Sequence, residues 1–262
     1  MQEVLRQPAV AGTFYPGDPS ELGALVDALL AGAAERVGPS PKAIIAPHAG
    51  YVYSGPVAAS AFALLLRRAQ PVSRVVLLGP AHRVRVEGLA SPGATVLRTP
   101  LGDVRVDVAA LSTIGAPESR EAHRREHSLE VELPFLQRVA PSASVVPLVV
   151  GAATAEEVAR ALEAVWGGPE TVVVVSSDLS HYLPYDVGRA ADERTAARIV
   201  ALDDTLVGDE ACGAAPINGL LRVARRRRMR AELVDLQSSG DTAGPRDEVV
   251  GYGAFALYEE EP

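Results

Sequence analysis

The sequence has little with which to cross-link itself, because it contains one cysteine, Cys212. A lone cysteine cannot form a disulfide within the chain, so a buried core must hold the fold and the thiol is free for chemistry. The sequence also lacks any run of roughly 18 apolar residues that could cross a membrane. Residues 1–6 lack the basic start and apolar run of a secretory signal. We therefore expect a soluble, cytoplasmic protein.

An excess of positive charge is absent as well. The net charge of −8 does not attract nucleic acid or an anionic membrane, so we expect neither as a partner. One basic run, residues 225–228 followed by Arg230, comes where the apolar stretch 217–224 would end a helix. Cations at that position complement the helix dipole and sit in water. We interpret the run as a helix end rather than a site for a polyanion.

The chain alternates short β-rich runs with longer helical patterns. This order predicts an α/β sandwich with a mostly parallel or mixed central sheet and helices on both faces. Strands are expected at residues 43–46, 74–78, 145–150, 171–175, 232–236 and 249–255. Helices are expected at residues 19–34, 56–66, 126–139, 154–165, 186–202 and 216–227. No linker-like tract or fixed repeat divides the sequence, which predicts a single domain over residues 1–262.

Polar residues concentrate where the predicted strands end. His48 follows the first strand, His82 the second, and His181 lies in the loop after the fourth. Because ligands of open α/β sheets bind at the carboxyl ends of the strands, these side chains are candidates for one site. Imidazole suits iron, copper and zinc, and Cys212 is the one thiolate that could add a softer ligand. On spacing alone, Cys212 could equally be a small buried hydrophobe.

Two other catalytic patterns compete with this interpretation. His123, Glu126 and His127 match the H-x-x-E-H pattern of inverted zinc peptidases, in which two histidines bind zinc and the glutamate activates water. The pattern is short, and it also describes the polar start of a helix before apolar positions. The loop 176–182 holds serine, aspartate and histidine as a serine hydrolase would. These residues crowd one loop, however, and the G-x-S-x-G elbow is missing.

Longer motifs carry a family resemblance. They are residues 11–16 (AGTFYP), 47–55 (PHAGYVYSG), 126–136 (EHSLEVELPFL), 176–182 (SSDLSHY) and 249–252 (VVGY). Together they resemble the Memo family, called AmmeMemoRadiSam system protein B in prokaryotes. The motifs occur in the order of the family and span nearly the whole chain. The resemblance implies a fold like that of the class III extradiol dioxygenases, which are LigB-like non-haem iron enzymes.

The resemblance also implies a metal site. Its ligands would be His48, His82 and Cys212, and its catalytic residues would be His127, Asp178 and His181. This placement displaces the zinc-peptidase interpretation, because His127 joins the pocket without His123. Extradiol dioxygenases bind iron with two histidines and a carboxylate. Here a thiolate replaces the carboxylate, so ring cleavage cannot be transferred from the fold.

Two functions from different classes follow from the resemblance. The first is a metal-dependent redox enzyme, an oxidoreductase that holds iron or copper, with zinc also open, and acts on an unidentified small molecule or oxygen species. The second is a non-catalytic metal-binding or peptide-binding protein that uses a vestigial dioxygenase pocket, since the animal relative is described as binding phosphotyrosine peptides. The name of the prokaryotic system further suggests a functional link to a radical SAM protein and an AMMECR-like protein.

Overall fold

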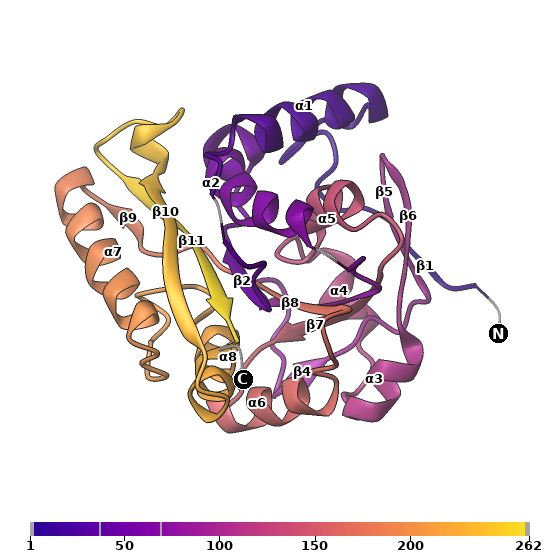
Figure 1. Cartoon of the computed structure of the whole chain (residues 1–262). Coiled ribbons are helices and arrows are strands. Elements are labelled where there is room, and N and C mark those ends of the chain that lie inside the picture. The colour runs from indigo at the N-terminus through magenta and orange to yellow at the C-terminus, as the bar shows by residue number, and fades with distance from the viewer. Residues whose placement is uncertain (1–2, 37, 69, 260–262) are drawn as a thin grey trace.

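A mixed β-sheet forms the centre of the computed structural model in Figure 1, which describes residues 3–36, 38–68 and 70–259. Within these residues, eight strands form one sheet in the order β10-β11-β2-β8-β3-β7-β4, with β9 paired to β11. The strands are β2 (Ala43–Ala46), β3 (Arg74–Pro80), β4 (Leu89–Ala90), β7 (Ser144–Val150), β8 (Thr171–Ser176), β9 (His181–Leu183), β10 (Arg230–Ser238) and β11 (Val249–Tyr258). The four strands β2, β8, β3 and β7 run parallel, and the others pair antiparallel.

Helices cover both faces of this sheet (Figure 1). They are α1 (Pro19–Gly32), α2 (Tyr51–Phe62), α5 (Leu133–Val139), α6 (Ala155–Ala164), α7 (Tyr185–Val200) and α8 (Ala214–Arg226). α2 packs on β2 and β11 with α1 and α5 beside it, α8 packs on β3 and β8 with α6 beside it, and α7 lies along β10 and β11. Within the described residues, no helix is long and apolar enough to cross a membrane. The predicted α/β sandwich with a mixed sheet is confirmed.

The helix ends follow local rules that the sequence displays. At the start of α1 the Asp18 carboxylate accepts hydrogen bonds from Ser20 N at 2.8 Å and Glu21 N at 3.0 Å. These bonds satisfy backbone donors that have no partner inside the helix. α6 opens on a capping box, in which the side chains of Thr154 and Glu157 each bond to the backbone of the other residue. Both helices therefore begin where their capping residues predict.

The prediction that a helix begins at Pro56 was wrong. α2 begins at Tyr51, whose N–H donates to Phe14 O at 2.8 Å. Proline inside a helix removes the hydrogen bond to the carbonyl four residues earlier, here that of Val52. Pro56 and Val52 both lie on the exposed side of α2, where water can satisfy that carbonyl. The proline therefore does not mark the start of the helix.

The helix expected over residues 126–139 was only partly correct. Its first half is irregular up to a short 3₁₀ turn at Glu130–Glu132, and α5 follows. The cause is the Glu126 carboxylate, which accepts hydrogen bonds from the backbone N–H groups of His127 and Ser128. A side chain that binds its own neighbouring N–H groups competes with helix formation. This irregular segment is what brings His127 to the site described below.

The sequence patterns did not predict several short elements. They are β1 (Leu5–Arg6), β5 (Val96–Thr99), β6 (Gly102–Arg105), α3 (Val108–Ile114) and α4 (Arg120–Arg124). β1, β5 and β6 form a second, three-stranded sheet in which β1 is parallel to β5. A strand of two residues is too short to display a period of two. This small sheet anchors the N-terminal segment beside the loops that carry the site.

The arginine run at the end of α8 behaves as predicted. α8 ends at Arg226, and the side chains of Arg225 and Arg226 pair with those of Asp204 and Glu156. Cations in the last turn of a helix are favourable, and here they are also neutralised by neighbouring acids. The run is therefore a helix end.

Candidate metal centre

The parallel strands deliver histidines to one edge of the sheet. β2 and β3 flank β8, and His48 and His82 follow the carboxyl ends of β2 and β3. His127 reaches the same edge from the irregular segment before α5. It is held there because Ser128 Oγ donates a 2.8 Å hydrogen bond to Pro80 O at the end of β3. Residues far apart in the sequence thus converge at the position where α/β enzymes bind their ligands.

His48, His82 and His127 form a cluster that could hold a metal ion. One ring nitrogen from each residue lies within 4.8 Å of those of the other two. The rings of His82 and His127 stack with their centroids 4.8 Å apart, and the ring of His48 stands edge-on to both. His48 is buried, whereas the other two are partly open to solvent. The cluster therefore has a closed side and an open side.

A chain of hydrogen bonds fixes the tautomer of His48. Ser176 Oγ lies 2.6 Å from Ser128 O, 2.7 Å from His48 Nδ1 and 2.7 Å from Glu132 Oε1. A hydroxyl has one hydrogen and a carbonyl can only accept, so this hydrogen goes to Ser128. His48 Nδ1 must then be the donor, which leaves the lone pair of Nε2 free. Burial raises the pKa of Glu132 well above its ordinary value, which favours the protonated carboxyl that could donate to Ser176.

The Glu126 carboxylate orients the other two histidines. It accepts hydrogen bonds from His82 N at 2.6 Å, His82 Nδ1 at 2.9 Å, His127 N at 2.9 Å and Ser128 N at 3.0 Å. Burial alone would raise the pKa of Glu126, but the hydrogen bonds from His82 and Ser128 hold it well below its ordinary value. A carboxylate on Nδ1 leaves Nε2 of His82 as the electron-pair donor. This is the usual way in which proteins fix a metal-binding histidine.

The donors of the cluster suit a transition metal. Burial lowers the pKa of His48 well below its ordinary value and that of His127 to about 4, so both rings are neutral at pH 7, as ligands must be. Nδ1 of His127 is buried without a hydrogen-bond partner in the described part of the chain. Imidazole nitrogens of this kind bind iron, copper or zinc. The three-histidine cluster therefore suits a transition metal, but its third member is His127, expected from the sequence as a catalytic residue, and not the expected ligand Cys212.

Cys212 lies beside this cluster through its contact with His48. Its Sγ is 3.5 Å from His48 Nε2, close to the separation of about 3.6 Å between nitrogen and sulfur ligands of a tetrahedral metal. Gly213 makes the approach possible, since a Cβ there would meet Ser177 Cβ at 2.6 Å. Burial, followed by the charge of Asp178, raises the pKa of the Cys212 thiol to about 12. The cysteine thus lies against His48 but outside the three-histidine cluster.

Comparison with known proteins identifies the family. The pattern of Memo-like proteins matches residues 6–256. The chain belongs to the Memo family. It is 36% identical over 264 residues to the MEMO1 family protein of Aquifex aeolicus, covering 95% of this chain and 97% of that protein. It is 37% identical over 280 residues to the MEMO1 family protein of Ignicoccus hospitalis, covering 96% of this chain and 98% of that protein.

The remaining predicted residues of this Memo family site lie in the loop after β8. Asp178 Oδ1 accepts a 2.8 Å hydrogen bond from His48 N, and burial raises the pKa of Asp178 to about 6. His181 begins β9, where its Nδ1 donates to Leu179 O at 2.8 Å and leaves Nε2 free. His181 stands outside the three-histidine cluster. Asp178 therefore positions the loop that carries His48, while His181 offers a ring nitrogen nearby.

The H-x-x-E-H interpretation does not agree with the structure. His123 is buried, and its Nε2 bonds to Ala90 O at 2.9 Å, so it is committed to the backbone of another loop. Glu126, the supposed activator of water, is bound to four donors instead. Of the two histidines in this motif, the three-histidine cluster contains only His127.

Sequence reasoning missed the supporting roles of Glu126, Ser176 and Glu132. None of them would bind a metal directly, yet they fix the rings that could. The available signal was Glu132 itself, an acidic residue directly before the apolar stretch 133–136. A fully buried carboxyl needs a hydrogen-bond partner, which makes such a residue a marker of an internal network.

Proposed function

We propose that this Memo family protein is a metal-dependent enzyme with redox activity toward a small molecule. Its metal would be held by His48, His82 and His127, with Cys212 as an additional contact. The observation that supports this is the convergence of three ring nitrogens within 4.8 Å of one another at the carboxyl edge of the sheet. Iron and copper suit a site of imidazoles beside a thiol, and zinc suits the same donors without redox chemistry.

Each neighbouring residue has a definite task in this proposal. A bound iron or copper ion would polarise an oxygen-containing ligand and exchange electrons with it. His48 closes the buried side, while the partly exposed His82 and His127 leave the opposite side open for a substrate. Nε2 of His181 carries no protein hydrogen bond among the described contacts, so it is the group that would accept or release a proton.

Metal analysis of untagged protein purified without oxygen tests the first half of the proposal. We expect about one equivalent of iron or copper per chain, and less than a tenth of this in His82→Ala. His123→Gln is the matched control, because it removes a histidine that lies outside the cluster; it should keep the metal in its folded fraction. Full metal content in His82→Ala would contradict the proposed ligands.

Oxygen uptake by the iron-loaded and copper-loaded protein tests the second half. An enzyme should consume oxygen or turn over a reductant at a rate that His82→Ala abolishes. A protein that only binds metal should retain the metal without such turnover. This result, with intact metal binding, would favour the non-catalytic alternative.

A further inference from the structure

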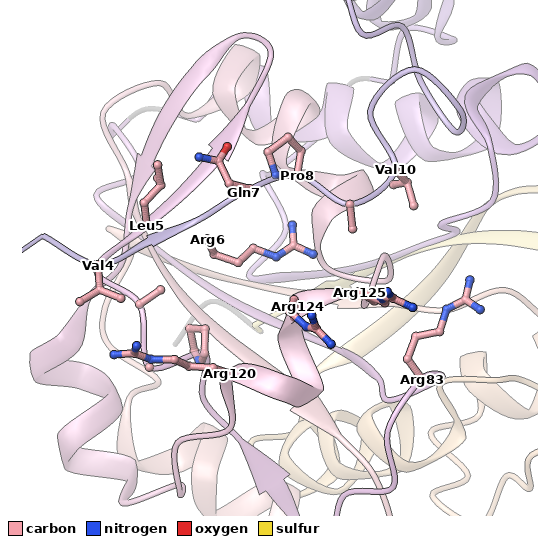
Figure 2. A pocket seen from close by; sticks show the side chains of 14 residues that line it. Val4, Leu5, Arg6, Gln7, Pro8, Val10, Arg83, Arg120, Arg124 and Arg125 are labelled. Carbon is pink, nitrogen blue, oxygen red and sulfur yellow. The ribbon is translucent and has the colours of Figure 1, made fainter.

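A cavity elsewhere on the described structure is lined by arginine (Figure 2). This cavity, of about 920 Å³, is bounded by residues 4–10, by the turn 92–94, by one arginine of the loop after β3, and by three arginines in or directly after α4. Its arginines are Arg6, Arg83, Arg120, Arg124 and Arg125. No acidic residue lines it, although the chain as a whole carries a net charge of −8. The cavity therefore concentrates positive charge, although the protein as a whole is negatively charged.

Arg6 is a fixed part of the wall. Its guanidinium pairs with the buried Glu130 and donates to His123 O and Glu126 O. Glu130 also accepts hydrogen bonds from Ala9 N at 2.7 Å and from neighbouring donors of the same segment. These contacts hold the N-terminal segment against the loop that carries the site. The cavity is consequently built into the fold.

The other four arginines are exposed and available. Among the described residues, Arg83, Arg120, Arg124 and Arg125 form no ion pair and no side-chain hydrogen bond. Figure 2 shows Arg83, Arg124 and Arg125 at one end of the cavity and Arg120 at the other. Guanidinium groups present donors in a fork that matches carboxylate and phosphate oxygens. Three such groups at one end bring together the kind of donors that an oxyanion requires.

The arginine end of the cavity adjoins the metal centre along the chain. Arg83 directly follows His82, and Arg125 directly precedes Glu126 and His127. Two arginines of the cavity are thus one and two residues away from histidines of the cluster, which places this end of the cavity near the metal centre.

We propose that this cavity binds an oxyanion group, a carboxylate or a phosphate, of the molecule that reaches the metal centre. The substrate class of the proposed enzyme is then a small anionic compound. That the bound anion is a substrate rests on the proposed function. That the cavity binds an anion rests on the cavity alone. The net charge of −8 opposes a long polyanion, so a compound of metabolite size is the occupant that the charges favour.

Titration calorimetry on the metal-free protein tests the proposal, with inorganic phosphate and succinate as separate probes. We expect saturable binding of one or both, weakened about tenfold or more in Arg83→Gln/Arg125→Gln. Arg85→Gln is the control: Arg85 is close in sequence and highly exposed, but it pairs with Glu87 and does not line the cavity. It should change the affinity less than about twofold. Tighter binding of phosphate than of succinate would assign the phosphate class, and the reverse order the carboxylate class.

Three outcomes would overturn the proposal. They are no saturable binding of either anion, equal weakening by Arg85→Gln, and preferential binding of an RNA oligonucleotide with equal loss in all variants. His82→Ala separates this proposal from the metal site, because it should lose metal and still bind the anion. The double arginine variant should conversely keep its metal. A protein that binds anions normally without ever holding metal would overturn the proposed function and leave the oxyanion site intact.

Discussion

The Nε2 atom of His48 lies 3.5 Å from the Sγ atom of Cys212, although 164 positions separate the two residues in the chain. Asp178 connects them. Its side chain accepts a hydrogen bond from His48 N at 2.8 Å, and its backbone carbonyl accepts one from Cys212 N at 3.2 Å. A single residue after β8 thereby sets the separation of an imidazole and a thiol. Because the thiol lies so close to His48, replacing Cys212 tests whether the thiol contributes to metal binding.

Replacing Cys212 by serine should weaken the binding of copper(I) by at least about tenfold more than the binding of iron(II). The reason is that a hydroxyl is a poor ligand for a soft ion and a better one for a harder ion. Competition with chelators of known affinity measures both constants under anaerobic conditions. The melting temperature of the metal-free protein should change little, because the two side chains are similar in size. Equal losses for the two metals would argue against a sulfur ligand.

Replacing Glu126 by glutamine should lower metal affinity about 10- to 100-fold, because the carboxylate orients both histidines by accepting hydrogen bonds from His82 Nδ1 and His127 N. The amide presents one oxygen where the carboxylate presents two, so part of the network loses its acceptor at a cost of about 2 kcal/mol in stability. Chelator competition and chemical denaturation measure the two effects. Glu87→Gln, which removes an exposed carboxylate from the loop before β4, should alter neither. Unchanged metal affinity in a destabilised Glu126→Gln would limit Glu126 to a structural role.

Replacing His181 by glutamine should leave metal content unaltered and reduce turnover about 10²- to 10⁴-fold. The prediction follows from its free Nε2 and from its place outside the three-histidine cluster. Oxygen uptake normalised to bound metal is the measurement. If the variant instead loses metal while remaining folded, His181 is a ligand. If specific activity is retained and the melting temperature falls, His181 only braces its loop.

Asp192 should make stability depend on pH. It is buried in α7, where its Oδ1 accepts a 3.0 Å hydrogen bond from Ser180 N and its carboxylate packs so closely on Gly251 that no side chain fits there. Burial raises the pKa of Asp192 from 3.8 to about 6. A raised pKa means that the protonated form is favoured by folding, so the stability it gives is present below pH 4 and lost as the pH rises through about 6.

Asp192→Asn should therefore be more stable than the wild type at pH 8, by at most about 3 kcal/mol, and equal to it near pH 4. Urea unfolding at the two pH values measures the difference. The neighbouring exposed carboxylate gives the control: Glu193→Gln should change stability by less than about 0.5 kcal/mol at either pH. A destabilised Asp192→Asn at pH 8 would show that the ionised carboxylate is favourable.

The placement of His48 and His82 could be predicted because neighbouring parallel strands end at one edge of the sheet. The position of His127 could not be predicted in the same way. It lies in a segment whose pattern favours a helix, and the side chain of Glu126 binds the backbone N–H groups that a helix would use. Hydrogen bonds to a buried carboxylate outweigh the helix propensity of this segment. The hydrophobic periodicity of the sequence does not reveal such bonds.

The arginine cavity was equally invisible in the sequence. Arg83 lies in the loop after β3 and Arg120 at the start of α4, and both line one cavity with residues 4–10, where Arg6 pairs with Glu130 across the fold. Contacts of this kind depend on tertiary packing, and a single sequence does not encode them in any local pattern. The charge run that did stand out in the sequence, residues 225–228, lies at a helix end and pairs with acids.

The position of β2 has a consequence for synthesis of the protein. β2 lies between β8 and β11, so the strand that carries His48 pairs on one side with a strand that comes among the last segments of the chain. A chain emerging from the ribosome cannot complete this pairing until residues 255–257 have left the exit tunnel. The pairing of β2 with β11 therefore cannot form before every other strand of the sheet has been synthesised, and contacts of such long range form slowly. During that interval the edge of β2 that later meets β11 stays unpaired, although the strands that bring the three histidines together have already been made.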